Sequence, residues 1–209
     1  LSIDVNTALL NIPDGNAEYL KSQLGYADFY SDFGWFGTLE IMDPFLGYQL
    51  RLFSATSFVY NDVVDGGLPS YHEHEDYDLG VYDFNVHDYE FNGSMTIALY
   101  KDGQRISNDD YIIAAFNGNQ CVGYTNEIIL PDELAKLALN PDGNTVYPLM
   151  VYSNNTENRL IYEVFEISTG LYYDIKQTIP FTEDMSLGDA LEPVAMDLSR
   201  QATKHKISR

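Results

Sequence analysis

Residues 109–123 read Asp-Asp-Tyr-Ile-Ile-Ala-Ala-Phe-Asn-Gly-Asn-Gln-Cys-Val-Gly, and this stretch decides the fold. The apolar run at 111–116 has the length and residue types of a buried strand, and the Asn-Gly-Asn at 117–119 is a tight-turn signal. Cys121 lies in the next apolar run, so a second strand is expected to pair with the first. The stretch predicts a β module and indicates no reaction.

The composition of the whole chain extends this prediction to an all-β fold. The 209 residues include 17 Tyr and 11 Phe, which favour strands, and Gly and Pro are scattered as turn residues. Apart from a short helical turn at 8–12, only residues 131–139 have a helical pattern, with Pro131 at the start, acidic residues in the first turn and an apolar stripe. This one short helix is expected to connect strands.

Changes in composition divide the chain into two β-rich modules. The expected parts are a small N-terminal β module at 1–62, an acidic linker or loop at 63–80, a β-sandwich module at 81–199 and a basic tail at 200–209. The second module is expected to be an Ig-like antiparallel β-sandwich, because short apolar runs alternate with turn signals. Its expected strands lie at 95–99, 111–116, 146–152, 160–167 and 171–179.

Alternation of apolar and polar residues also predicts strands in the first module. Leu1, Ile3 and Val5 alternate with polar residues at the start of the chain. Residues 48–52 alternate as well, with the apolar side chains expected to face the core, and residues 57–60 are expected to pair with them as a neighbouring strand.

The net charge of −21 argues against two classes of partner. So acidic a chain repels the phosphates of nucleic acids and the surface of anionic membranes. No apolar run approaches the ~20 residues that span a bilayer, so membrane insertion is not expected either. Four of the 11 basic residues lie within the last ten positions, namely Arg200, Lys204, Lys206 and Arg209. Such a tail is either a mobile terminus or an arm that docks on an acidic neighbour.

Several stretches of the second module agree, in order, with one known pattern. They are Ser94–Ile97, Asp110–Tyr124, Val151–Ser153, Leu160–Gly170 and Ile179–Leu198. Through them the module resembles β-sandwich modules that recur in large secreted and surface proteins, especially of bacteria. The chain departs from the pattern at Val122, where a basic residue normally precedes the glycine.

The first module is similar to a partner module that often precedes the second in such proteins. The matching residues are Tyr19–Gln23, Tyr26–Tyr30, Gly34–Leu39 and Pro44–Leu52. The departure here is Phe45, since a glycine normally follows the proline.

The resemblance implies architectural or accessory units, and it brings no catalytic residues. In the resembled modules another strand, rich in Gly and Trp, comes before the segment that begins here at Leu1. A sheet that lacks this strand has an open edge, and open edges recruit strands from other chains. Candidate assembly residues are therefore Leu1, Ile3 and Val5, together with Arg200, Lys204, Lys206 and Arg209 of the tail.

A histidine pair in the acidic linker is a candidate metal site. His72 and His74 lie among four acidic residues between 73 and 78, and imidazole with carboxylate is a ligand set for transition metals. The alternative is a solvated acidic loop. Calcium suits a chain with many carboxylates, but no segment completes the spacing of a calcium-binding loop. No cofactor is expected.

Two other kinds of surface site are expected. Asn92 and Asn154 fit the acceptor pattern for N-glycosylation, which applies only if the protein is secreted by a eukaryote or its virus. Residues 26–37 contain six aromatic side chains, which either fill a small core or contact a glycan or a protein. The candidate contact residues are Tyr26, Tyr30, Trp35 and Phe36, of which Trp35 or Phe36 is expected at the surface.

The chain has none of the common sequence motifs of hydrolases, metalloproteases or nucleotide-binding enzymes, so no enzyme activity is predicted. The expected function is that of a noncatalytic extracellular structural protein, at the cell surface or on the exterior of a virion. It would assemble with itself or with another extracellular protein in a filament, sheath or virion exterior, through open sheet edges and charge complementarity. The alternative is a carbohydrate-binding or adhesion module that uses the aromatic residues near Trp35.

Overall fold

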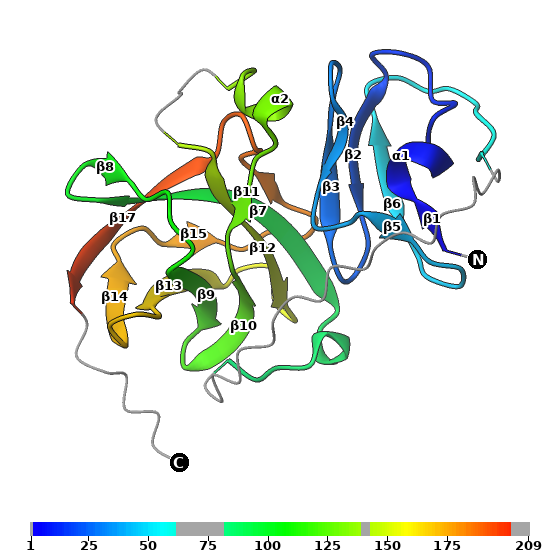
Figure 1. Cartoon of the computed structure of the whole chain (residues 1–209). Helices are drawn as coiled ribbons and strands as arrows, with labels where there is room; N and C mark the ends of the chain where they lie inside the picture. Colours follow the sequence, from blue (N-terminus) through cyan, green and yellow to red (C-terminus); the bar gives the residue numbers. More distant parts are fainter. Residues whose placement is uncertain (1, 62–81, 139–142, 202–209) are drawn as a thin grey trace. The chain divides into compact units, whose positions relative to one another are not determined.

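A computed structural model describes residues 2–61, 82–138 and 143–201, and the chain divides into two compact units, Leu1–Asp78 and Leu79–Arg209 (Figure 1). The prediction of an all-β fold is confirmed. Within the described residues the only helices are α1 (Val5–Ala8), α2 (Asp132–Ala135) and the short 3-10 helix η1 (Val86–Asp88). The boundary between the units falls inside the predicted linker at 63–80, and all residues of this linker lie outside the described ranges.

The first unit is built on a four-stranded antiparallel sheet in the order β4-β3-β2-β6 (Figure 1). Its strands are β2 (Ala17–Lys21), β3 (Tyr26–Tyr30), β4 (Gly34–Gly37) and β6 (Gln49–Leu52). A separate two-stranded ladder joins β1 (Ile3–Asp4) to β5 (Ile41–Met42). Helix α1 and the turn after it supply Val5, Ala8 and Leu9 to the core, which also contains Leu20 and Trp35.

The start of the chain differs from the predicted strand. The Asp4 side chain accepts a 2.9 Å hydrogen bond from the backbone N–H of Thr7, and this N-cap begins helix α1 directly after the two residues of β1. Val5 is therefore a buried helical residue, and Ile3 is half-buried in β1. A local capping bond ends the strand alternation after Ile3.

Strand β6 has the predicted alternation, because Leu50 and Leu52 are half-buried and Gln49 and Arg51 are exposed. The predicted neighbouring strand at 57–60 is wrong, since these residues form no strand. The segment is held by other contacts: the Asn11 side chain donates to the carbonyl oxygen of Val59 (2.9 Å), the N–H of Asn61 donates to the carbonyl oxygen of Ala8 (3.1 Å), and Phe58 packs against the core.

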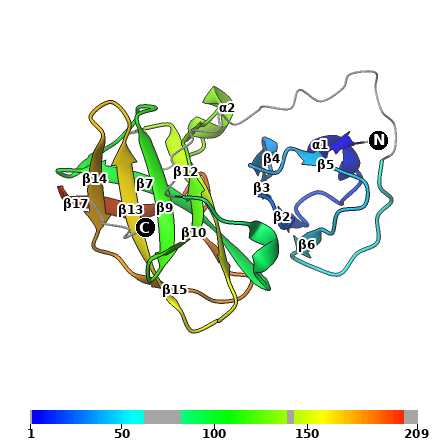
Figure 2. The same ribbon diagram turned by 90° about the horizontal axis from the view of Figure 1, so that it is seen from below.

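The second unit contains a large curled sheet in the order β10-β9-β13-β14-β17-β7-β12-β11, with β8, β15 and β16 pairing off this path. Figure 2 shows β13, β9 and β10 next to one another. The strands of the main path are β7 (Phe91–Lys101), β9 (Tyr111–Asn117), β10 (Gln120–Thr125), β11 (Ile128–Ile129), β12 (Thr145–Ser153), β13 (Arg159–Glu166), β14 (Leu171–Ile175) and β17 (Val194–Gln201). The short additional strands are β8 (Gln104–Arg105), β15 (Ile179–Pro180) and β16 (Ser186–Leu187).

The sheet of the second unit is antiparallel apart from β16 and β17, which both run parallel to β7. The expectation of a purely antiparallel sandwich is corrected in this respect. Helix α2 is also shorter than the predicted 131–139, with Pro131 at its N-cap and its last residue at Ala135. Strand β17 continues to Gln201, so the predicted start of the tail at residue 200 falls within a strand.

The stretch at 109–123 forms β9, a turn and β10, as the sequence predicts. Gly118 has a φ of 62°, a left-handed conformation that glycine adopts without strain. Ile113 of β9 faces the main core together with Leu149 and Val164, whereas Ile112 packs on the opposite face of the sheet with Cys121. Both faces of β9 are therefore buried, which explains its uninterrupted apolar run.

Strand β10 lies against β12, although the two are not hydrogen-bonded neighbours in the sheet. A Cβ atom at Gly123 would overlap the carbonyl oxygen of Met150 in β12. Only a residue without a side chain allows this approach, so Gly123 lets the sheet curl back on itself over the main core.

Replacing Gly123 by Ala should therefore destabilise the second unit by about 3 kcal/mol, because backbone atoms of β12 must move to make room. Urea unfolding followed by far-ultraviolet circular dichroism measures the change. Gly118→Ala is the matched control, because nothing lies near its Cβ position and only the left-handed φ costs about 1 kcal/mol. Equal effects of the two substitutions would contradict closure at Gly123.

Candidate functional site

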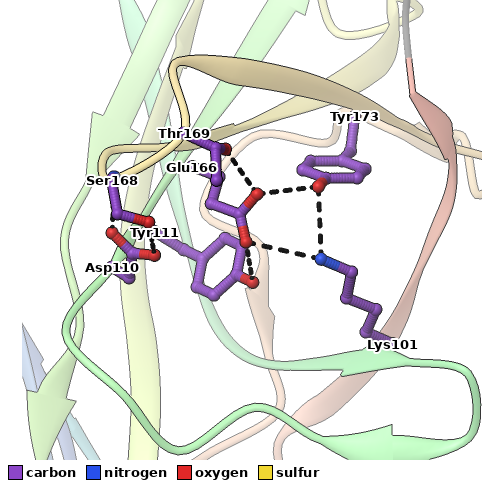
Figure 3. Close-up of polar contacts among 7 residues, drawn as sticks. All are labelled: Lys101, Asp110, Tyr111, Glu166, Ser168, Thr169 and Tyr173. Atoms are coloured by element: carbon purple, nitrogen blue, oxygen red, sulfur yellow. Dashed lines mark hydrogen bonds and ion pairs between the residues drawn. The ribbon is translucent and has the colours of Figure 1, made fainter.

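The most elaborate polar cluster of the described residues surrounds Glu166, at the end of β13 (Figure 3). One carboxylate oxygen accepts a hydrogen bond from the Tyr111 hydroxyl (2.6 Å), and the other accepts from Thr169 (2.6 Å) and Tyr173 (2.8 Å). The ammonium group of Lys101, at the end of β7, lies 3.4 Å from the first oxygen and 3.2 Å from the Tyr173 hydroxyl. The cluster thus joins β7, β9, β13 and β14.

The surroundings of Glu166 keep its carboxylate ionised. Burial alone would raise the pKa of Glu166, but hydrogen bonds from Thr169, Tyr111 and Tyr173 and the charge of Lys101 lower it to about 2. Burial and the bond to Glu166 raise the pKa of Tyr111 to about 12. The hydrogen bond with Tyr173 raises the pKa of Lys101, against the effect of burial.

These protonation states leave the cluster poorly suited to catalysis at neutral pH. A general base needs a pKa near the working pH, and a nucleophilic lysine must lose its proton readily. Glu166 is a weak base and Lys101 stays protonated, with its ammonium group 4.7 Å from the centre of the Tyr173 ring. The arrangement fits a structural role, and we call Glu166 together with Lys101, Tyr111, Thr169 and Tyr173 the Glu166 clamp.

A second polar contact fastens the turn between β13 and β14 beside this cluster (Figure 3). The carboxylate of Asp110 accepts hydrogen bonds from the backbone N–H of Ser168 (2.7 Å) and from the Ser168 hydroxyl. The N–H of Ile167 also donates to the carbonyl oxygen of Asp110 (2.7 Å). The residues just before β9 therefore hold the turn that carries Thr169.

The aromatic residues proposed as a contact surface lie mostly in the core of the first unit. Tyr26, Tyr30 and Trp35 are only 2%, 8% and 6% exposed, and Phe36 is half-buried. The expectation of a surface position is corrected for Trp35, whose ring packs edge-on against Phe29 at 5.3 Å between centroids. A small sheet fills its core with large rings, and this leaves little of Trp35 for a glycan.

The structure describes only some of the other predicted site residues. Leu1, Lys204, Lys206, Arg209 and the two histidines, His72 and His74, lie outside the described residues, as does the side chain of Arg200. Within the described ranges no group of three or more His, Cys, Asp or Glu side chains is placed to hold a metal ion. Cys121 is buried, and its burial raises the pKa of the thiol to about 11.

The two glycosylation candidates occupy different positions in the second unit. Asn92 is half-buried in β7, opposite Tyr152 of β12. Asn154 is exposed, but its side-chain amide donates to the carbonyl oxygen of Asp88 (2.9 Å) and its side-chain oxygen accepts from the N–H of Glu90 (2.7 Å). Asn154 therefore tethers the segment that follows η1.

One unusual feature of the first unit concerns Phe45. This residue is fully exposed and has a φ of 73°, a left-handed conformation that costs a residue with a Cβ about 1 kcal/mol or more. One sign of this conformation is present in the sequence: Phe45 occupies the position after a proline where the resembled module has a glycine. The neighbouring Leu46 is 47% exposed and Phe53, just after β6, is 69% exposed. Phe45 and Leu46 precede β6 and Phe53 follows it, and we refer to these three exposed apolar residues at the two ends of the strand as the β6 patch.

The Glu166 clamp makes a prediction about acid stability. The folded pKa of Glu166 is about 2, below its ordinary 4.5, so its ionised form stabilises the fold above pH 4.5 and this contribution is lost as the pH falls towards 2. Glu166→Gln should cost about 2–3 kcal/mol at pH 7 and much less at pH 2. Denaturant unfolding at both pH values measures this. Glu157→Gln, at an exposed position, should change stability by less than about 0.5 kcal/mol, and a pH-independent loss for Glu166→Gln would contradict the clamp.

Comparison of the chain with protein-family models, with curated proteins and with solved structures finds no significant match. No helix among the described residues is long and apolar enough to cross a membrane. The function of this chain must therefore be inferred from its own residues.

Proposed function

We propose that this chain is a noncatalytic extracellular structural protein that assembles with copies of itself or with another protein of a surface filament, sheath or virion exterior. The single observation that carries the proposal is the β6 patch. A fully exposed Phe45 at a φ of 73° combines backbone strain with an apolar surface exposed to water. Strained residues of this kind concentrate at binding and switch sites.

The loop that carries Phe45 is held in place by its own contacts. The hydroxyl of Tyr48 accepts a 2.6 Å hydrogen bond from the N–H of Asp43 and lies 3.2 Å from the Asp43 carbonyl oxygen, which closes the loop at its base. Ser2 also donates to the side chain of Asp43. An ordered loop presents Phe45 and Leu46 without a large loss of entropy on binding, which favours a protein contact.

The charge of the chain favours a protein partner over a lipid surface. A net charge of −21 repels anionic membranes, whereas a protein with a basic surface would attract it. The basic residues at 200–209 of one copy are complementary in charge to the acidic remainder of a neighbouring copy. Contacts through the tail and contacts through the β6 patch respond oppositely to salt, because salt screens attraction in the first case and repulsion in the second.

The assembly proposal predicts self-association in analytical ultracentrifugation over a wide range of protein concentrations, at about 0.05 M and about 0.5 M NaCl. Association through the patch should strengthen at the higher salt, and association through the tail should weaken there and disappear when residues 202–209 are removed. This deletion leaves β17 intact. A strict monomer under every condition would contradict self-assembly.

Phe45→Gly separates binding from stability. Glycine tolerates the left-handed φ, so the substitution should not lower the free energy of unfolding, yet it should weaken patch-mediated association at least about tenfold. Leu24→Ser is the control, because Leu24 is an exposed apolar residue in the turn between β2 and β3. Equal weakening by both variants would show that the contact is not specific to the patch.

A further inference from the structure

Strand β6 differs from the other outer strand of its sheet in how its edge is protected. The outer edge of β4 is occupied by the side chain of Asn6, which accepts a 2.8 Å hydrogen bond from the N–H of Trp35 and donates to the Trp35 carbonyl oxygen at 3.5 Å. Asn6 thereby takes the place of a neighbouring strand. Within the described part of the chain, β6 pairs with β2 alone.

The edges of the second unit are also covered or short. Strand β10 lies against β12 at Gly123, and β11 at the other end of the sheet consists of Ile128 and Ile129 only. Short or covered edges are common protections against pairing with another chain. The sequence of β6 contains no proline, and the charge of Arg51 is paired with Glu18 at 2.8 Å.

We propose that β6 pairs antiparallel with β6 of a second copy of this chain, with Leu50 opposite Leu50 about a two-fold axis. This inference rests on the proposed assembly function and names the contact that serves it. The pairing would join two four-stranded sheets into one continuous sheet. Main-chain hydrogen bonds supply the affinity in strand addition, and the side chains select the register.

The side chains of β6 favour this register over a shift of one residue and over a shift towards Arg51. A shift of one residue would place the half-buried Leu50 and Leu52 opposite residues of the solvent face, which breaks the alternation of the sheet. Moving the two-fold axis from Leu50 to Arg51 shifts the pairing by two residues. It would place Arg51 directly opposite Arg51 of the second copy, and like charges in this position are unfavourable. With Leu50 at the axis, Arg51 instead lies opposite Gln49.

The same register accounts for Phe53. When the pairing continues one residue beyond Leu52, Phe53 comes opposite Gly47 of the second copy. A Cβ atom at Gly47 would meet nothing within 4 Å, so there is room for a ring above this glycine. Phe53 already extends the ladder on the other side of β6, since its N–H donates to the carbonyl oxygen of Asn16 at 3.0 Å. The exposed ring would be covered by the partner's backbone.

Cysteine cross-linking tests the register in the whole chain. Directly opposite residues of antiparallel strands have Cα atoms about 4.5–5.5 Å apart, within the range of a disulfide, while residues displaced by two positions lie beyond about 7 Å. Under mild oxidation at about 0.5 M NaCl, Leu50→Cys should form a covalent dimer, and Gln49→Cys and Arg51→Cys alone should not. An equal mixture of Gln49→Cys and Arg51→Cys chains should form one, and both positions are exposed, so this arm does not disturb the core. Cys121 is buried and serves unchanged as the background.

The outcomes separate this inference from the proposed function. Cross-linking of Leu50→Cys and of the mixed pair supports the register. Self-cross-linking of Gln49→Cys or of Arg51→Cys alone overturns it in favour of another register. An assembled chain in which none of these variants cross-links overturns β6 pairing but leaves the assembly function in place. A chain that stays monomeric in ultracentrifugation and gives no covalent dimer overturns both.

Discussion

The close approach of β10 to β12 at Gly123 is the constraint on which the second unit depends. Because a Cβ atom there would overlap the carbonyl oxygen of Met150, the position must be glycine for β10 to pack against β12 when the sheet curls. The approach covers the edge of β10 and encloses the core that contains Ile113, Leu149 and Val164. An enclosed core and a covered edge make this unit a poor place for strand addition.

The Glu166 clamp closes the same core in a different way. Lys101, Tyr111 and Tyr173 are contributed by three strands, and all of them contact one carboxylate at the end of a fourth. A buried charge is tolerated only when its hydrogen bonds are satisfied, and here the partners are supplied by strands that meet only when the sheet is complete. The clamp is therefore expected to favour the fully formed sheet over partly paired alternatives.

The sequence predicts β7, β9, β12 and β13 of the second unit, because burial leaves apolar runs such as 111–116 that need no distant information. It missed β17, and the strand expected at 171–179 ends at Ile175. It could not predict the contact between Gly123 and Met150 or the assembly of the Glu166 clamp, since their residues are far apart in the chain and follow no local spacing. In the first unit, local polar bonds overrode the pattern. The N-cap at Asp4 placed Val5 in a helix. Hydrogen bonds from Asn11 to Val59 and from Asn61 to Ala8 hold the segment that was expected to form a strand at 57–60. Phe45 was visible in the sequence only as a departure from a resembled motif, and its exposure and left-handed backbone required the structure.

The open edge of β6 and the acidic composition of the chain have opposite effects on the association of two copies. Strand β6 is four residues long, so its main-chain bonds alone give weak pairing, and a net charge of −21 on each copy opposes the approach of two free chains. Weak pairing opposed by repulsion keeps dilute chains apart and prevents indiscriminate edge-to-edge aggregation. Under the proposed function, the balance would reverse where chains are concentrated at a surface, or where salt or a basic neighbour offsets the charge, and the β6 edge would then pair. In the proposed assembly, the acidic surface would determine when chains associate, and the β6 edge with its exposed apolar residues would determine where.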